Sequence, residues 1–169
     1  MDSGRSERSD QTLSTILYAH GDATARHGPG RILLVHICND VGKWGAGFVL
    51  AISRRWKEPQ RAFLALFRDE MKPKLGDVQF VDVEPEFTVA NMIGQHGIRR
   101  SSKGTPPIRY EAVETALERV AQMAKERGAR VQMPRIGCGL AGGTWDHIEP
   151  LIERTLIREG INVTVYDFT

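Results

Sequence analysis

Two glycine-rich segments are the strongest candidates for a ligand site. Residues 36–48 (HICNDVGKWGAGF) and residues 133–145 (MPRIGCGLAGGTW) each leave a short apolar run and enter an amphipathic one. Glycine lets the backbone approach a ligand closely, and the N–H groups at the start of a helix attract anions. The pattern therefore predicts a diphosphate-binding site. A pair of tight turns is the alternative, because neither segment has the lysine–serine pair of a Walker motif or the GxGxxG spacing.

Three side chains of the first segment are the candidate catalytic residues. His36 lies beside the predicted ligand loop, where an imidazole can exchange protons near neutral pH; a buried strand histidine is the alternative. Asn39 could orient a water molecule, or it could make local backbone hydrogen bonds in a turn. Asp40 is the nearest acid and a candidate general base, or it faces water. In the second segment, Cys138 is either a reactive thiol or a small side chain that points away from the ligand.

The elements that must position these segments alternate between strands and helices. Apolar runs predict strands over residues 12–19, 31–38, 77–83, 87–93, 129–133 and 162–168. Helices are predicted over residues 46–56, 60–71, 110–127 and 145–159, with Pro59 separating the first two and Pro150 making the first turn of the last irregular. Residues 98–108 are a polar loop and a candidate flap. This order predicts an α/β domain of three layers around a mixed six-stranded sheet, with ligands bound beyond the carboxyl ends of the strands.

Composition excludes several classes of protein. The apolar fraction of 41% and the charged fraction of 26% are those of an ordinary globular protein. The apolar run at residues 32–35 is far shorter than the roughly 20 residues of a membrane span. We expect a flexible tail over residues 1–11, a single domain over residues 12–169, and a cytoplasmic monomer. Cys38 and Cys138 form neither a disulfide framework nor a CxxC pair, so we expect no metal and no cofactor.

Four segments resemble the macrodomain family, which binds ADP-ribose. They are residues 20–24 (HGDAT), 33–52, 133–156 and 163–168, and the resemblance runs from about residue 13 to the end of the chain. Within the family the chain is most similar to the branch that holds the terminal ADP-ribose protein glycohydrolase and the ADP-ribose-1″-phosphate phosphatase. The resemblance implies a three-layer α/β/α fold with a central mixed six-stranded sheet.

The resemblance also implies a set of ADP-ribose contacts. Asp22 would hydrogen-bond the adenine amino group, and Tyr166 would pack on the adenine ring, with core packing as the alternative for Tyr166. The first glycine segment would line the distal ribose and the diphosphate, and the second would wrap the diphosphate from the other side. The full expected set is Asp22, Ala23, Gly45, Ala46, Gly47, Gln95, Gly137, Cys138, Gly139, Leu140, Ala141, Gly142, Gly143 and Tyr166.

The catalytic pair of the nearest branch does not carry over. Where the terminal glycohydrolase has a nucleophilic lysine and an assisting aspartate, this chain has Gln95 and Ala141, so a covalent lysine mechanism is not implied. We expect a water held by the diphosphate and by His36 or Asn39 to attack C1″ of the distal ribose and release ADP-ribose from modified acidic residues of proteins.

Two other functions stay open. His36 and the sequence GKWGAG at residues 42–47 favour an ADP-ribose-1″-phosphate phosphatase. Gln95 and Ala141 favour a reader, a protein that binds ADP-ribose without turnover. The expected partners are ADP-ribose and ADP-ribosylated proteins. The mildly basic balance, a net charge of +2, also allows ADP-ribosylated nucleic acid.

Overall fold

A computed structural model describes residues 15–168 of the chain. The expected tail over residues 1–11, and residues 12–14 of the first expected strand, lie outside the described residues. Within them the expected alternation of strands and helices is confirmed. The helices are α2 (Phe48–Arg55), α3 (Glu58–Leu66), α4 (Tyr110–Arg127) and α5 (Trp145–Ile152), and α5 continues as the π-helical segment η1 (Glu153–Ile157). The strands are β1 (Leu17–His20), β2 (Ile32–Asn39), β3 (Val78–Glu84), β4 (Phe87–Gln95), β5 (Arg130–Met133) and β6 (Val163–Asp167).

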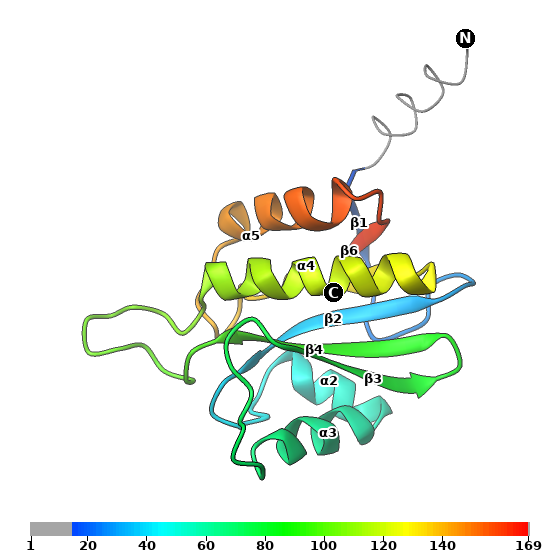
Figure 1. The fold of residues 1–169 in the computed structure, drawn as a ribbon. Coiled ribbons are helices and arrows are strands. Elements are labelled where there is room, and N and C mark those ends of the chain that lie inside the picture. The colour runs from blue at the N-terminus through cyan, green and yellow to red at the C-terminus, as the bar shows by residue number, and fades with distance from the viewer. Residues whose placement is uncertain (1–14, 169) are drawn as a thin grey trace.

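The six strands form one mixed sheet in the order β1-β6-β5-β2-β4-β3. Neighbouring strands are parallel except β3 and β4, which form an antiparallel hairpin. Helices α2 and α3 cover one face, and α4, α5 and η1 cover the other (Figure 1). The three-layer α/β/α prediction is therefore confirmed.

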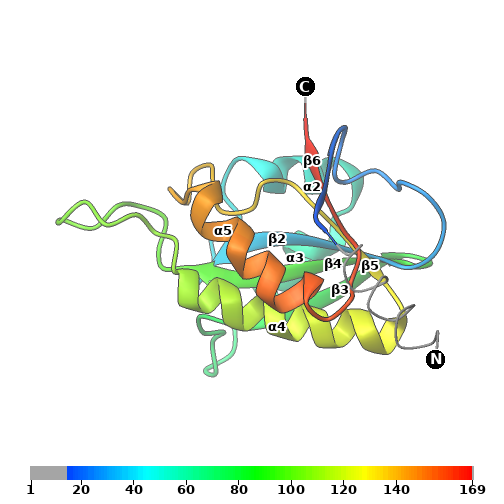
Figure 2. The same ribbon diagram turned by 90° about the horizontal axis from the view of Figure 1, so that it is seen from above.

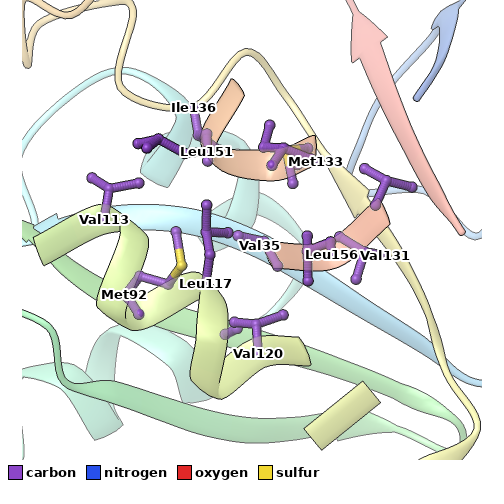
Figure 3. Packing of buried hydrophobic residues seen from close by; sticks show 14 of the residues in the cluster. Val35, Met92, Val113, Leu117, Val120, Val131, Met133, Ile136, Leu151 and Leu156 are labelled. Atoms are coloured by element: carbon purple, nitrogen blue, oxygen red, sulfur yellow. The ribbon is translucent and has the colours of Figure 1, made fainter. Parts of the chain in front are cut away.

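The central strands are apolar on both faces because both faces are covered. Along β2, Leu33 and Val35 face the α4 and α5 layer, whereas Ile32 and Leu34 face the α2 and α3 layer. Figure 3 shows Val35 among side chains of α4, α5, η1 and β5 in the first of these two cores. No helix in the described part of the chain has the length and apolar character needed to cross a bilayer.

The predicted break between α2 and α3 at Pro59 is confirmed, whereas the irregular first turn expected for the helix that contains Pro150 is wrong. Pro59 lies in the first turn of α3, where a proline is tolerated because its missing N–H has no partner there, and the helix ends at Leu66 rather than at residue 71. The irregularity near Pro150 follows the proline instead of preceding it. The backbone widens in η1, where the N–H of Arg158 donates to the carbonyl of Glu153 five residues back, at 2.9 Å.

Three loops gather at one edge of the sheet. Because β5, β2 and β4 are parallel neighbours, the chain leaves all three at the same end. The second glycine segment follows β5, the first follows β2, and residues 96–109 follow β4 and project from the body before α4 begins (Figures 1 and 2). Sheet topology thus brings the two glycine segments together.

Candidate functional site

A groove of three adjoining cavities runs along this edge of the sheet. The first cavity has a volume of about 560 Å³, the second about 370 Å³ and the third about 380 Å³. The first and second share Phe48, Pro134 and Arg135, and the second and third share residues of both glycine segments, so the three form one continuous path. A linear ligand can therefore span all three.

Asp22 lies at the polar wall of the first cavity. Its Oδ1 accepts hydrogen bonds from the amide and the hydroxyl of Thr24, at 2.9 and 2.6 Å, and its Oδ2 lies 3.2 Å from the guanidinium of Arg55. Burial raises the pKa of Asp22, but the contacts with Thr24 and Arg55 outweigh burial and hold this pKa below its ordinary value. The neighbouring Ala23 is buried and also lines the cavity. Asp22 is thus an ionised, oriented acceptor.

Two aromatic side chains line the opposite wall of the first cavity. The ring of Tyr166 stacks on His27, with centroids 4.2 Å apart and planes 16° apart. Phe168, directly after β6, is 80% exposed and also lines the cavity. The prediction named Tyr166 and missed Phe168, although an aromatic residue just beyond the last strand is a signal that the sequence contains.

The second cavity lies between the two glycine segments. It is lined by Ala46, Gly47, Gln95, Gly137, Gly139, Leu140 and Ala141 from the expected set. Gly47 is the N-cap of α2 at φ 86° and ψ −139°, a conformation that requires glycine, and no side chain caps the helix. The first turn of α2 also contains no acidic residue. The first amides of α2 therefore remain available to an anionic ligand.

Other glycines of the second segment are needed for packing. A Cβ atom on Gly142 would lie 2.6 Å from Cβ of Pro106, and one on Gly143 would lie 2.6 Å from the carbonyl oxygen of Gly137. Gly142, Gly143 and Cys138 line none of the three cavities. The Cys138 thiol lies 3.5 Å from the carbonyl oxygen of Ile136, and burial raises its pKa, which disfavours a reactive thiolate.

His36 is buried and lines the second cavity. The Nδ2 of Asn91 donates to carbonyl and amide oxygens, so its Oδ1 faces His36 and accepts from Nε2 at 2.5 Å. Among the described residues, Nδ1 of His36 has no partner. Burial lowers the pKa of His36 to about 4, against a weaker opposite effect of the Asn91 hydrogen bond. The imidazole is thus neutral near pH 7, which argues against His36 as an acid in catalysis.

Asn39 organises the first glycine segment. Its Oδ1 accepts from the amides of Val41 and Lys43, both at 3.1 Å, and its Nδ2 donates to the carbonyl oxygen of Lys43 at 2.6 Å. Although Asn39 lines the third cavity, the amide group is occupied by its own loop. This matches the turn alternative rather than the catalytic prediction.

Asp40 points away from the groove and lines none of its cavities. Its Oδ2 lies 2.7 Å from Nδ1 of His96, and its Oδ1 accepts from the amide of Gly97 at 2.8 Å. Burial raises the pKa of Asp40, but the contacts with Gly97 and His96 outweigh burial and hold it below its ordinary value. These contacts fix residues 96 and 97 to the first glycine segment, and the general-base role of Asp40 stays a prediction.

Gln95 and Ala141, the two residues at the positions of the missing catalytic pair, both line the second cavity. Gln95 ends β4 and lines the second and third cavities, with its Nε2 donating to the carbonyl oxygen of Gly97 at 3.0 Å. Ala141 is buried against the second cavity. Gly45 lines the third cavity together with Lys43, an exposed cation that the prediction missed. In residues 15–168 no group of three or more His, Cys, Asp or Glu side chains is placed to hold a metal ion.

Arg135 is a second residue that the prediction missed. It lines the first and second cavities, two residues after the end of β5. Its guanidinium donates to both carboxylate oxygens of Asp167, at 2.8 and 3.1 Å, and lies 5.2 and 5.1 Å from the ring centroids of Tyr18 and Trp145. The ion pair with Asp167, which also lines the first cavity, fixes the Arg135 guanidinium between the first two cavities.

Comparison with known proteins agrees with this arrangement, although no family model matches the chain. The structure of a macrodomain protein from Streptomyces coelicolor is 55% identical, with a TM-score of 0.80 over 90% of this chain and 99% of that chain. ADP-ribose glycohydrolase OARD1 of Bos taurus is 27% identical over 95% of this chain and 97% of that protein.

A longer relative matches at similar identity. Chromodomain-helicase-DNA-binding protein 1-like of Mus musculus is 30% identical over 94% of this chain, but the match covers 18% of that protein. This chain thus spans about a fifth of the length of that relative. The fold, the groove and the Streptomyces structure together establish that this chain belongs to the macrodomain family.

Proposed function

We propose that this macrodomain binds ADP-ribose along the groove and hydrolyses its bond to acidic side chains of proteins. The proposal depends above all on the second cavity, where the two glycine segments meet the uncapped start of α2. This is a site for a diphosphate. The relationship to ADP-ribose glycohydrolase OARD1 supports the same ligand.

The ligand's orientation follows from the two ends of the groove. Asp22 offers an acceptor for an adenine amino group, and Tyr166 and Phe168 offer apolar faces for the ring, so the adenine occupies the first cavity. The diphosphate then lies in the second cavity, with Arg135 beside it. The distal ribose reaches the third cavity, and its C1″ faces the exit toward the modified protein.

Hydrolysis at C1″ does not require a catalytic lysine. A glutamate or aspartate esterified to C1″ departs as a carboxylate, whose conjugate acid has a pKa near 4, so the leaving group needs no strong acid. The oxocarbenium-like transition state is stabilised by the diphosphate that the glycine segments hold close to C1″. A water beside the diphosphate attacks C1″ and passes its proton to a diphosphate oxygen. Asn39 holds the backbone of the first glycine segment, and the buried, neutral His36 packs against Trp44 and Phe48 of that segment.

The test is release of ADP-ribose from a carrier protein mono-ADP-ribosylated on Glu or Asp, followed by mass spectrometry. We expect release by the wild type and none by Gly139→Glu, which places a carboxylate in the second cavity. Binding of ADP-ribose without release would refute the hydrolase proposal. ADP-ribose-1″-phosphate is the control substrate for the phosphatase alternative, which depended on the sequence of the first glycine segment and on His36, and His36 is buried and neutral.

One observation favours a second function, that of a reader. Among the described residues, no Asp or Glu lines the second or third cavity. A reader would bind the ADP-ribosylated carrier and free ADP-ribose with similar affinity and release nothing. Calorimetry on both ligands in parallel with the release assay separates the two functions.

A further inference from the structure

Residues 96–107, which we call the basic arm, project from the body as a hairpin-like loop (Figure 2). At its root the amide of His96 donates to the carbonyl oxygen of Pro107, at 2.8 Å. Near its tip the amide of Ser101 donates to the carbonyl oxygen of Thr105, at 2.9 Å, and the Oγ of Ser101 accepts from the amides of Lys103 and Thr105. The backbone of the arm is therefore organised along its length.

The arm carries only positive formal charge. Residues 97–110 contain three arginines and one lysine and no acidic residue. Every residue from 98 to 105 is exposed. Within the described part of the chain, the side chains of Arg99 and Lys103 make no hydrogen bond or ion pair, and Arg100 donates only to the carbonyl oxygen of Gly104. These cations are available to an external partner.

The arm is packed against the ligand site at its root. Pro106 and the guanidinium of Arg100 lie beside Gly142 of the second glycine segment, and the amide of Ile108 donates to the carbonyl oxygen of Ala141 at 3.1 Å. Ile98, 45% exposed, lines the third cavity with Leu140, 72% exposed. The exit of the groove is thus bordered by an apolar rim and, beyond it, by cations.

We propose that the basic arm docks an acidic peptide segment flanking the ADP-ribosylated residue. The inference rests on the proposed function, because the carrier protein must leave the groove at the third cavity, beside the arm. Carboxylates on either side of the modified residue pair with Arg99 and Lys103, and aliphatic parts of the peptide contact Ile98 and Leu140. The arm has no Phe, Tyr or Trp on which a base could stack, so the observations favour a peptide over a nucleic acid.

The experiment compares two peptides that carry ADP-ribose through a non-hydrolysable amide link. One has three Asp residues on each side of the modified position, and the other has three Asn residues. Affinities are measured by fluorescence anisotropy at low salt for the wild type, for Arg99→Gln/Lys103→Gln, and for the control Arg61→Gln/Arg68→Gln, which removes the same charge from exposed positions that line none of the three cavities.

We expect the wild type and the control to prefer the Asp peptide by about fivefold, because exposed ion pairs are individually weak. The arm variant should bind both peptides equally and at the wild-type affinity for the Asn peptide. Equal wild-type affinity for the two peptides, or a preference that survives in the arm variant, overturns the proposal. A competition experiment gives a further outcome that overturns the proposal. In it, single-stranded oligothymidine displaces the ADP-ribosylated peptide from the wild type at a lower concentration than unmodified Asp peptide does, and this difference is lost in Arg99→Gln/Lys103→Gln.

The measurement does not depend on turnover. An arm-dependent preference together with no release of ester-linked ADP-ribose would refute the hydrolase and support the docking. Release of ADP-ribose without any preference for the Asp peptide would support the hydrolase and refute the docking.

Discussion

Asp40 and His96 join the two loops on either side of the third cavity, with Oδ2 of Asp40 2.7 Å from Nδ1 of His96. Asp40 directly follows β2, and His96 is the first residue of the basic arm. The second oxygen of Asp40 accepts from the amide of Gly97, so one carboxylate fixes the root of the arm to the first glycine segment.

Replacing Asp40 tests whether it positions or catalyses. We expect Asp40→Ala to lower the free energy of unfolding at pH 7 by about 1–2 kcal/mol, because it leaves the Gly97 amide without its partner. The pKa of Asp40 is lowered in the folded protein, so this stabilisation is present above the ordinary value of 3.8 and is lost as the pH falls through the lower folded value. Urea unfolding at pH 7 and pH 3 should show a smaller difference in the free energy of unfolding between wild type and variant at pH 3 than at pH 7.

The exposed Asp69, for which no partner is found in the described residues, provides the control, and Asp69→Ala should change little. If Asp40→Ala is stably folded and binds ADP-ribose normally but releases none from the carrier, the positioning assignment is wrong and the general-base prediction is right.

His36 should make the protein sensitive to mild acid. Its pKa is about 4 when folded and 6.5 in a model peptide, so between these values the unfolded chain binds a proton that the folded protein does not. Stability should therefore fall by about 2 kcal/mol between pH 7 and pH 5. His36→Gln, which keeps a polar group for Asn91, should lose this dependence in urea unfolding at the two pH values. An unchanged pH dependence in the variant would show that another group is responsible.

The release reaction should in turn show no inflection near pH 6.5 attributable to His36. The imidazole is neutral on both sides of that value. A wild-type pH–rate profile that bends near pH 6.5, and loses the bend in His36→Gln, would return His36 to the catalytic set.

Gly139 is the best position at which to block the groove without disturbing the fold. Among the described residues a Cβ atom there meets nothing within 4 Å, whereas a Cβ atom on Gly137 would overlap the side chain of Ile108. We expect Gly139→Glu to weaken ADP-ribose binding at least about 100-fold by occupying the diphosphate position with a like charge. Gly139→Ala is the matched control and should bind within a few-fold of wild type by calorimetry. If Gly139→Glu still binds ADP-ribose strongly, the diphosphate does not lie in the second cavity.

Phe168 should contribute more to adenine binding than its place at the end of a strand suggests. Tyr166 already stacks on His27, whereas Phe168 is 80% exposed beside the first cavity. Stacking on a base contributes about 1–3 kcal/mol, so Phe168→Ala should weaken ADP-ribose binding roughly tenfold. Ribose 5-phosphate, which lacks the adenine, should bind wild type and variant alike. Loss of affinity for both ligands would mean that the substitution acts through the fold.

The sequence predicted the elements better than it predicted what individual side chains do. The helix predicted over residues 110–127 is α4, which Gly128 ends in a left-handed conformation at φ 63°. The order of strands could not be read from the chain, because β2 pairs with β5 and β4, which follow it at very different separations. The sequence indicated a candidate flap over residues 98–108, but without the strand order it could not show that this loop borders the third cavity.

The roles of polar residues depend on contacts that lie far apart in the sequence. Whether His36 faces solvent or the core depends on Asn91, which is 55 positions away. The exposed side chain that contacts Asp40 is His96, which is 56 positions away in the sequence. Asn39 differs, because its partners lie within four residues, and the turn alternative for it could be stated from the sequence.

The contact between Arg135 and Trp145 also makes tryptophan fluorescence a reporter of ligand binding in the groove. Trp44 and Trp56 are buried, and their indole N–H groups donate to Ser53 and Glu84. Trp145 is half-buried against Arg135, so its emission should lie to the red of the other two and respond when an anion beside Arg135 alters the local field. Occupancy of the groove can then be followed by intrinsic fluorescence, without any label on the ligand.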